Sequence, residues 1–290
     1  MSKPSVLLQI DSDPHPSAFD AVVAVDAGAD HLLQYSGVQV AQVAELVHGL
    51  MFTRGPQDLH RSAIFIGGSD VAAGEALLEA VTACFFGPLR VSAMLDANGA
   101  NTTAAAAVLA AAKHIDLNDA EVLVLAATGP VGQRVVRLLA HQGASVRAGS
   151  RSQHRAADTC DRIRQVVPQA SLTAHGTSDP ASLAAALKGV HAVIAAGAAG
   201  IELLTENART AAVDLCVAID LNAVPPLGIA GVDVSDKAVD QSGVRCYGAI
   251  GVGGTKMKIH KAALRKLFKS NDQVLDAEQI FAIGRELTGD

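Results

Sequence analysis

The chain has 290 residues and a net charge of −6; half of the residues are hydrophobic, but only 3% are aromatic. This length favours about two domains, and the negative charge and scarcity of aromatic side chains argue against nucleic-acid binding. The four cysteines lie far apart without metal-binding spacing, so we expect neither a disulfide framework nor a metal site.

Short apolar segments alternate with helix-length segments through the first 115 residues. The expected strands are residues 6–10, 63–66 and 90–95, and the expected helices are residues 17–26, 38–47, 71–84 and 101–114. A strand-then-helix rhythm builds a mostly parallel sheet with helices on its faces. We therefore predict an α/β fold with a first domain over residues 1–115.

The same rhythm restarts after a short polar connection at residues 116–119. The expected strands are residues 121–126, 145–148, 171–174, 190–195, 216–219 and 244–249, with helices at 131–141 and 155–166. We predict a second α/β domain over residues 116–255. Two final helices, about residues 256–269 and 276–287, are expected to complete the first domain.

A glycine-containing turn follows the strand at 121–126 and opens the next helix: Ala127-Thr128-Gly129-Pro130-Val131-Gly132. It matches the dinucleotide-binding G-x-G-x-x-G pattern, except that Ala127 replaces the first glycine. Gly129 would let the backbone approach a pyrophosphate, and Gly132 would let helix and strand pack closely. This turn predicts a Rossmann-type parallel sheet in which Thr128, Gly129, Pro130, Val131 and Gly132 bind the cofactor. A purely structural turn is the alternative.

The end of the next strand reads Gly149-Ser150-Arg151-Ser152-Gln153-His154-Arg155. An NAD-selective site has an acidic residue here for the ribose hydroxyl groups. Hydroxyl and guanidinium groups instead suit a 2′-phosphate, so Ser150, Arg151 and Arg155 predict NADP, with NAD possible. The alternative is that both arginines belong to an ordinary exposed loop.

Three further strand ends carry candidate cofactor contacts, at Ala196 and Gly197, at Asn222, and at Gly253 in a glycine-rich segment before the last helices. Open α/β sheets bind ligands at the carboxyl ends of their strands. Each of these positions alone is more often structural, but together they predict one binding edge.

Several segments together resemble the NADP-dependent methylene-tetrahydromethanopterin dehydrogenases of methylotrophic bacteria. The most specific are Asn98-Gly99-Ala100-Asn101-Thr102-Thr103 and Pro225-Pro226-Leu227-Gly228-Ile229. Others are residues 11–13, 17–20, 26–31, 52–55, 63–68, 85–88, 94–97, 128–132 and 248–254. The resemblance covers essentially the whole chain. Ala127, Ala97 and Ala100 depart from the usual family residues, which puts loop geometry and pterin affinity in doubt but not the class.

The resemblance implies oxidation of a methylene group that bridges two nitrogens of tetrahydromethanopterin, the one-carbon carrier, giving the methenyl compound and NADPH. It also implies an N-terminal pterin domain, an NADP domain, a cleft between them and a homo-oligomer, expected to be a trimer. The alternatives are a methylene-tetrahydrofolate dehydrogenase, a shikimate-type dehydrogenase and a non-catalytic NADP-binding regulator.

Hydride transfer from such a carbon needs no strong base, because the two nitrogens delocalise the resulting positive charge. A carboxylate nearby would stabilise that charge, and Asp20 is the candidate. Ser17-Ala18-Phe19-Asp20 also fits a capping box in which Asp20 accepts from the Ser17 amide, and both interpretations stay open. Lys256 is expected in the first turn of its helix, where a lysine opposes the helix dipole, and this suggests a role beyond stability. It is a candidate for bonding the pterin carbonyl or a polar part of the substrate tail, with a solvated surface lysine as its alternative.

The uncharged polar side chains that suit a neutral pterin ring or the nicotinamide amide are Asn98, Asn101, Thr102 and Thr103. Asp13 is a further substrate-side candidate, as a weaker alternative to Asp20 for the carboxylate. Asp13 is alternatively a turn residue, and the two threonines are alternatively helix caps. Bifunctional folate enzymes use Tyr-x-x-x-Lys for cyclohydrolase activity, but here Tyr35 and Tyr247 are followed four residues later by Gln39 and Gly251. We therefore predict no cyclohydrolase activity.

The chain begins without a recognisable secretion signal and has no apolar run long enough for a membrane span. We expect a cytoplasmic enzyme that binds neither membranes nor nucleic acids.

Overall fold

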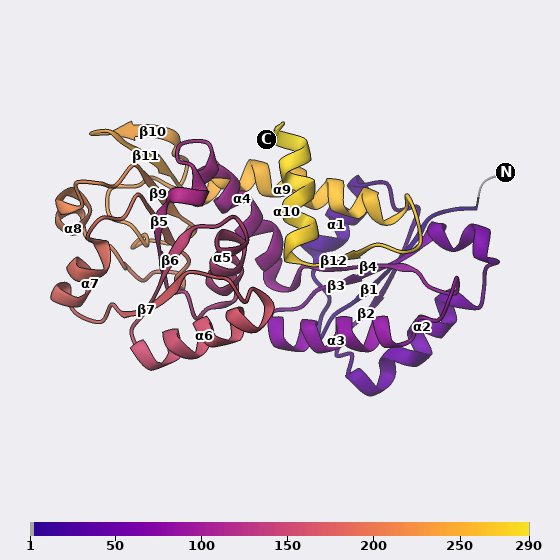
Figure 1. Ribbon diagram of the computed structural model, residues 1–290. Helices are drawn as coiled ribbons and strands as arrows, with labels where there is room; N and C mark the ends of the chain where they lie inside the picture. Colours follow the sequence, from indigo (N-terminus) through magenta and orange to yellow (C-terminus); the bar gives the residue numbers. More distant parts are fainter. Residues whose placement is uncertain (1–2, 290) are drawn as a thin grey trace. The chain divides into compact units, whose positions relative to one another are not determined.

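The computed structural model describes residues 3–289, which form two compact units (Figure 1). One unit holds the chain up to Thr102 and again from Met257, and the other holds Thr103–Lys256. Both divisions fall within helices, α4 (Ala100–Ala112) and α9 (Ala249–Leu267). The polar connection at residues 116–119 forms a short 3-10 turn, in which the Asp116 side chain accepts from the Asn118 amide.

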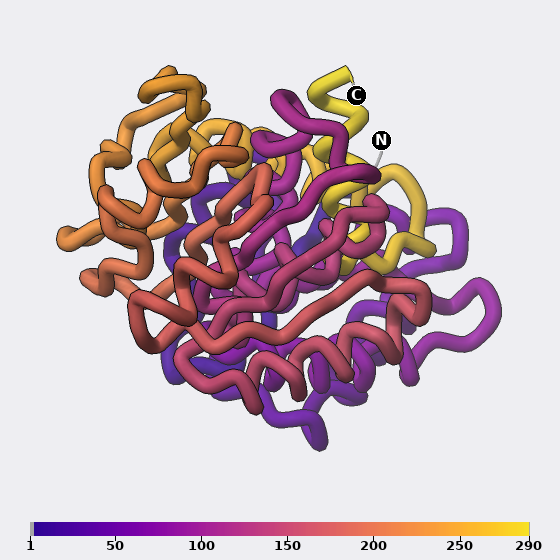
Figure 2. Tube along the Cα trace, turned by 60° about the vertical axis from the view of Figure 1, so that its left-hand side comes forward, coloured from indigo at the N-terminus to yellow at the C-terminus, as the bar shows by residue number. Residues whose placement is uncertain are grey.

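A parallel five-stranded sheet with the order β12-β4-β3-β1-β2 is the centre of the first unit. The strands are β1 (Val6–Ile10), β2 (His31–Tyr35), β3 (Ser62–Ile66), β4 (Ser92–Leu95) and β12 (Val274–Leu275). The helices that belong wholly to this unit are α1 (Ala18–Asp26), α2 (Val43–Met51), α3 (Val71–Ala83) and α10 (Ala277–Thr288). Because β12 pairs with β4, the C-terminal segment, yellow in Figure 2, completes the N-terminal sheet.

Helices cover both faces of this sheet, with α2 and α3 on one face and α1 and α10 on the other (Figure 1). All residues of β3 are therefore buried, as its continuous apolar sequence indicates. The edge strand β2 is mostly exposed, and sequence analysis missed it because neither alternation nor a buried run marks it. The helix expected at residues 38–47 starts as a 3-10 turn at Val40–Gln42 and continues as α2 to Met51.

The second unit contains a seven-stranded sheet with the order β10-β11-β9-β8-β5-β6-β7, parallel except for β10. Its strands are β5 (Glu121–Leu125), β6 (Ser145–Ser150), β7 (Leu172–Gly176), β8 (Ala192–Ala195), β9 (Val217–Asp220), β10 (Lys237–Gln241) and β11 (Val244–Tyr247). Its helices include α5 (Pro130–His141), α6 (Gln153–Val166), α7 (Pro180–Leu187) and α8 (Glu206–Ala211). The order of its parallel strands is that of the doubly wound Rossmann fold, with the topological switch point between β5 and β8.

The start of α9 differs from the expectation. The helix begins at Ala249, seven residues before the expected start at Lys256, so the glycines at 251–254 lie in a helix and not in a loop. A side chain at Gly248 or Gly251 would collide with the backbone of the segment at 233–237. The Ile250 amide donates to the Val234 carbonyl at 2.8 Å. Gly248 and Gly251 therefore serve close packing of the first helical turn.

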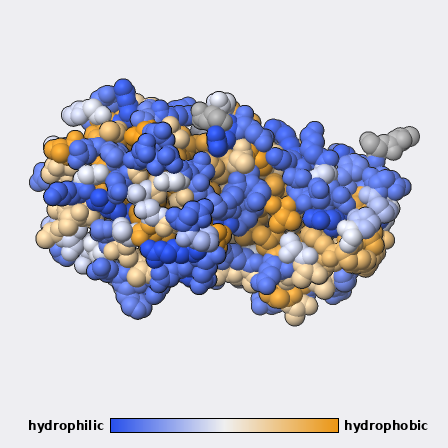
Figure 3. All heavy atoms as spheres, viewed as in Figure 1, coloured by the Kyte–Doolittle hydropathy of each residue, from blue (hydrophilic) through white to orange (hydrophobic). Residues whose placement is uncertain are grey.

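The face of the molecule drawn in Figure 3 is mostly hydrophilic with separate apolar areas. Within residues 3–289, no helix has the length and apolarity that crossing a membrane requires. The same residues contain no group of three or more His, Cys, Asp or Glu side chains arranged to hold a metal ion. All four cysteines are free thiols.

Candidate functional site

The turn between β5 and α5 has a left-handed residue, but not the one expected. Ala126 adopts φ 55°, whereas Ala127 is not among the residues with positive φ. The Ala127 amide donates to the Gly149 carbonyl at 2.9 Å, which ties the turn to β6. The sharp bend that the family pattern assigns to its first glycine therefore falls one residue earlier in this chain.

The two glycines of the turn have different surroundings. A Cβ on Gly132 would lie 2.5 Å from the Ala126 oxygen and 2.8 Å from the Ala127 Cα, so only glycine allows α5 to approach the strand end this closely. A Cβ on Gly129 would meet the Ala126 oxygen at 3.4 Å and the Ala196 oxygen at 3.8 Å, which are ordinary contacts. A glycine at position 129 is therefore not required for packing. The space beside its Cα lies between the loop after β5 and the loop after β8.

The N-terminus of α5 is suited to an anion. Gly129 is the N-cap, Pro130 follows at the start of the helix, and the first turn contains no acidic residue. The amides of Val131 and Gly132 have no acceptor inside the helix, and the positive end of the helix dipole lies here. The Gln133 side chain donates to the Thr128 carbonyl at 2.8 Å and supports the loop from within.

The end of β6 presents two exposed arginines. Ser150 is buried and its hydroxyl accepts from the Ser152 amide at 3.3 Å, while Ser152 caps α6 by accepting from the Arg155 amide at 3.4 Å. Among residues 3–289, neither the Arg151 nor the Arg155 side chain makes a hydrogen bond or ion pair, and both are exposed. The serines therefore fix the backbone while both guanidinium groups remain available to a ligand.

The structure uses two other predicted cofactor residues in loop packing. A Cβ on Gly197 would lie 2.7 Å from a Leu203 methyl group. The Asn222 side chain donates to the carbonyls of Val224 and Pro226, at 3.0 Å each, and accepts from the Val224 amide at 2.9 Å. The side chain of Asn222 therefore shapes its own loop.

Asp220 ends β9 and is buried; sequence analysis placed this strand end on the predicted binding edge but named Asn222, and not Asp220, as the site residue. Its two carboxylate oxygens accept from the amides of Asn222 at 3.0 Å and Ile229 at 2.9 Å. Burial raises the pKa of this carboxyl above its ordinary value, and these backbone hydrogen bonds oppose the shift. Its position directly after an apolar strand was a usable signal.

A second set of acidic residues lies at the carboxyl edge of the N-terminal sheet. Asp11 follows β1, is buried, and accepts from the amides of Asp13 at 2.9 Å and Ser17 at 3.3 Å. Burial is the main reason that the pKa of Asp11 is raised. A Cβ on Gly67, just after β3, would lie 3.1 Å from an Asp11 oxygen and 3.7 Å from an Asp20 oxygen. Both carboxylates thus face the same glycine.

Asp13 and Asn98 hold neighbouring loops. Both oxygens of Asp13 accept from Ser69, one from its amide and one from its hydroxyl, at 2.9 Å each. Asn98 is exposed, has a left-handed φ of 56°, and donates through its amide to the Gly68 carbonyl at 2.5 Å. The ends of β1, β3 and β4 are therefore linked at one edge.

Asp20 lies in the first turn of α1. Half of the expected capping box is present, since the Ser17 hydroxyl accepts from the Asp20 amide at 3.2 Å, but the Ser17 amide donates to Asp11. An Asp20 oxygen lies 4.0 Å from Nε2 of His260, whose buried ring stacks on Phe65 with a centroid distance of 5.6 Å. Sequence analysis missed His260 because it predicted the helix but did not predict which of its side chains are buried.

Asn101 and Thr102 are buried inside the N-terminal unit. The Asn101 amide donates to the Leu95 carbonyl at 2.6 Å and to the Asp276 carboxylate at 3.0 Å. The Thr102 hydroxyl and amide donate to the two oxygens of Asp96, at 2.6 and 3.0 Å. These contacts tie α4 to the end of β4 and to the start of α10.

The structure places Lys256 and Gly253 inside α9, so Lys256 does not lie in a first helical turn, and the dipole argument for it was wrong. Lys256 is half-buried and precedes His260 by four residues, which puts both on one side of the helix. Gly253 has open space around its Cα. Thr103 is half-buried in α4.

Comparison with known proteins agrees with this architecture. Residues 18–98 match the family described as "Methylene-tetrahydromethanopterin dehydrogenase, N-terminal", and residues 126–269 match "NAD(P)H-binding". The chain is 45% identical to "Bifunctional protein MdtA" of Methylorubrum extorquens, over 99% of this chain and 100% of that protein. It is 30% identical to the NAD(P)-dependent methylenetetrahydromethanopterin dehydrogenase of the same organism, over 98% and 99% of the two chains.

The chain belongs to the methylene-tetrahydromethanopterin dehydrogenase family. The family and the two-domain α/β fold predicted from the sequence are therefore confirmed. Among solved structures, 5-ketofructose reductase from a Gluconobacter strain matches with a TM-score of 0.55 and 15% identity, covering 98% of this chain and 99% of that one. A likeness at this identity concerns the fold alone.

Proposed function

We propose that this member of the family oxidises methylene-tetrahydromethanopterin to the methenyl compound and transfers the hydride to NADP⁺. The observation that carries the proposal is the turn after β5, with an open Gly129 and a close-packed Gly132, combined with family membership over the whole chain. The names of the two relatives describe a bifunctional protein and an NAD(P)-dependent methylenetetrahydromethanopterin dehydrogenase.

The residues of the second unit fit a phosphorylated dinucleotide. The backbone from Thr128 to Gly132 and the N-terminus of α5 would hold the pyrophosphate. Arg151 and Arg155, exposed beside Ser150, would hold the 2′-phosphate. When bound, NADP⁺ supplies the hydride acceptor. The protein has to align the donor carbon with it at roughly 3–3.5 Å and to exclude water.

On the substrate side, we assign Asp20 the role of stabilising the positive charge that develops on the methylene carbon. Support comes from its limited side-chain exposure of 14%, from His260, whose Nε2 lies 4.0 Å from an Asp20 oxygen, and from its position facing Gly67 together with Asp11. Lys256 would contact a polar group of the pterin. Asp13, Asn98 and Thr103 would contact or shape the ring site, whereas Asn101 and Thr102 would support it through their buried hydrogen bonds.

We further propose that residues 1–115 with 256–290 bind the pterin, that residues 116–255 bind NADP, and that the enzyme is a cytoplasmic homo-oligomer. Support for the division of binding is the match of residues 18–98 to the family's N-terminal domain and of residues 126–269 to an NAD(P)H-binding domain.

The test is formation of NADPH by purified protein with methylene-tetrahydromethanopterin or methylene-tetrahydrofolate, comparing kcat/KM. We expect the methanopterin compound to be preferred; preference for folate would favour the alternative, and no NADPH with either would contradict the proposal. The Asp20→Asn variant should lower kcat roughly 10–100-fold without changing NADP affinity. Asp26→Asn, on the same helix, is the matched control.

The absence of cyclohydrolase activity stays a prediction. Tyr247 is buried and its hydroxyl lies 2.7 Å from Nε2 of His114, while Tyr35 is 46% exposed at the edge strand. Because one relative's name contains the word bifunctional, hydrolysis of the methenyl compound should be measured directly. Hydrolysis no faster than in buffer would agree with the prediction, and efficient turnover would contradict it.

A further inference from the structure

A pocket of about 230 Å³ lies in the N-terminal unit, away from the acidic residues at the carboxyl edge of its sheet. Ser5 and Arg61 line one side and directly precede β1 and β3, so the pocket lies at the amino-terminal edge. Arg265, Phe268 and Lys269, from the end of α9 and just beyond it, line the other side. The candidate dehydrogenase residues use the opposite edge, so this is a separate place in the fold.

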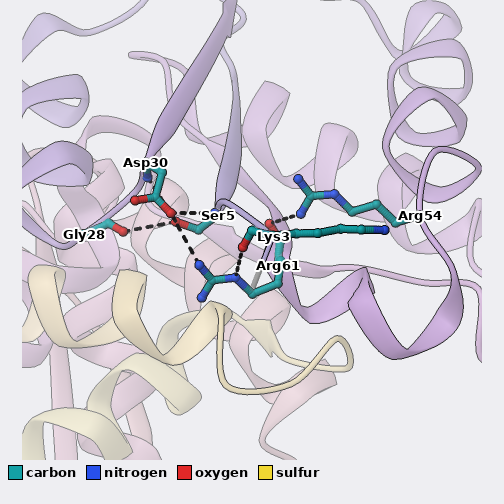
Figure 4. A network of polar contacts seen from close by, with 6 residues as sticks. All are labelled: Lys3, Ser5, Gly28, Asp30, Arg54 and Arg61. Atoms are coloured by element: carbon teal, nitrogen blue, oxygen red, sulfur yellow. Dashed lines mark hydrogen bonds and ion pairs between the residues drawn. The ribbon is translucent and has the colours of Figure 1, made fainter. Parts of the chain in front are cut away.

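Hydrogen bonds hold the Arg61 guanidinium group in place. Its Nε donates to the Lys3 carbonyl at 2.8 Å, and one terminal nitrogen lies 3.4 Å from Asp30 (Figure 4). Asp30 is itself held by the amide and hydroxyl of Ser5, at 2.7 and 2.8 Å. Arg54 donates to the Arg61 carbonyl at 2.7 Å. One wall of the pocket therefore carries a pre-positioned cation.

The positive charges around the pocket exceed the negative ones. Arg265 and Lys269 are exposed, and neither side chain makes a hydrogen bond or ion pair among residues 3–289. Asp30, bonded to Arg61, is the carboxylate nearest in this network, whereas Asp26 is paired with Lys261 at 2.7 Å. Arg61 is matched by Asp30, but Arg265 and Lys269 have no carboxylate partner among the described residues, so the pocket keeps an excess of positive charge that attracts anions.

We propose that this pocket binds a small phosphate-bearing anion. Guanidinium groups match phosphate oxygens in a bidentate geometry, and Phe268 offers an apolar wall to a short organic group. The pocket volume of about 230 Å³ suits a small phosphorylated metabolite and not a dinucleotide. Basic residues also stabilise helix C-termini, but that effect does not explain why Arg61, on another element, faces the same cavity.

The experiment is calorimetric titration of the full chain with inorganic phosphate at constant ionic strength. An Arg151→Gln/Arg155→Gln background removes both guanidinium groups of the candidate 2′-phosphate site. Phosphate held by the backbone turn at 128–132 would not depend on Arg265 or Lys269, so the result does not depend on the dehydrogenase proposal. In that background we expect phosphate binding at the pocket that adding Arg265→Gln/Lys269→Gln weakens at least about tenfold. Both added changes are at exposed side chains, and circular dichroism checks folding.

The matched control is Lys237→Gln/Arg285→Gln, which removes the same charge from two other exposed positions. Retained affinity in this control, with loss in Arg265→Gln/Lys269→Gln, supports the pocket. Equal weakening in both variants means a general charge effect and overturns the proposal, as does the absence of phosphate binding in the parent. As a second measurement, phosphate should raise the Tm of the parent above that in chloride of equal ionic strength.

Discussion

Replacing Gly132 by alanine tests the packing at the start of α5. The added Cβ would lie 2.5 Å from the Ala126 oxygen and 2.8 Å from the Ala127 Cα, both backbone atoms that cannot rotate away. The helix must therefore move from the strand end. Overpacking of this kind costs about 1–3 kcal/mol, and the better helix propensity of alanine returns up to about 1 kcal/mol. We expect a net loss of about 1–2 kcal/mol in the free energy of unfolding.

Gly129→Ala is the matched control, because its Cβ would make only ordinary contacts. Loss of glycine at an N-cap should cost at most about 1 kcal/mol, but the methyl group would occupy the approach to the pyrophosphate and raise the Kd for NADP roughly tenfold or more. Urea unfolding and calorimetric titration measure both quantities. An unchanged urea midpoint for Gly132→Ala, or wild-type NADP affinity for Gly129→Ala, would refute the reasoning.

Three further substitutions test other parts of the second unit and of α9. Arg151→Ala should raise the Kd for NADP about 10–100-fold and leave NAD binding unchanged; equal loss for both cofactors would place the arginine elsewhere. Gly253→Ala, in open helical surroundings, should stabilise the protein by about 0.5–1 kcal/mol, whereas weaker NADP binding would show that this glycine contacts the cofactor. Asp220→Asn should cost about 1–3 kcal/mol, because an amide group cannot accept from both backbone amides that the carboxylate serves. Since burial raises the pKa of Asp220 above 3.8, the folded protein binds this proton more tightly than the unfolded chain. Its contribution to stability therefore falls as the pH rises from below 3.8 through the raised pKa, and a variant that kept this slope would contradict the assignment.

Local patterns were sufficient for most of the second unit. The apolar run of β5, the turn that follows it and the cap of α5 are adjacent in sequence, so spacing alone predicted them. The edge strand β2 was not predicted, because its exposure removes the burial that produces a readable pattern. The predicted start of α9 was wrong because glycines usually indicate a loop. The backbone segment whose close approach requires Gly248 and Gly251 is not adjacent to them in sequence, so only the three-dimensional structure shows it.

The candidate pterin side depended more on tertiary contacts. Asn101 was predicted as a ligand from its polarity, but its side chain bonds Asp276, which lies 175 residues away in sequence. Thr102 bonds Asp96, which lies only six residues earlier, but this contact depends on how the chain turns from β4 into α4. His260 became a candidate neighbour of Asp20 only because α9 packs beside α1.

The sequence by itself determined the alternation of strands and helices, the dinucleotide-type turn and the family, since each depends on residues that are neighbours in the chain or on similarity along it. Tertiary structure alone decided which polar side chains are used inside the fold and which remain available, because hydrogen-bond partners come from distant segments. It also decided that the strand ends carrying Asp11 and Gly67 meet at one edge, since the order of parallel strands is a property of the whole sheet.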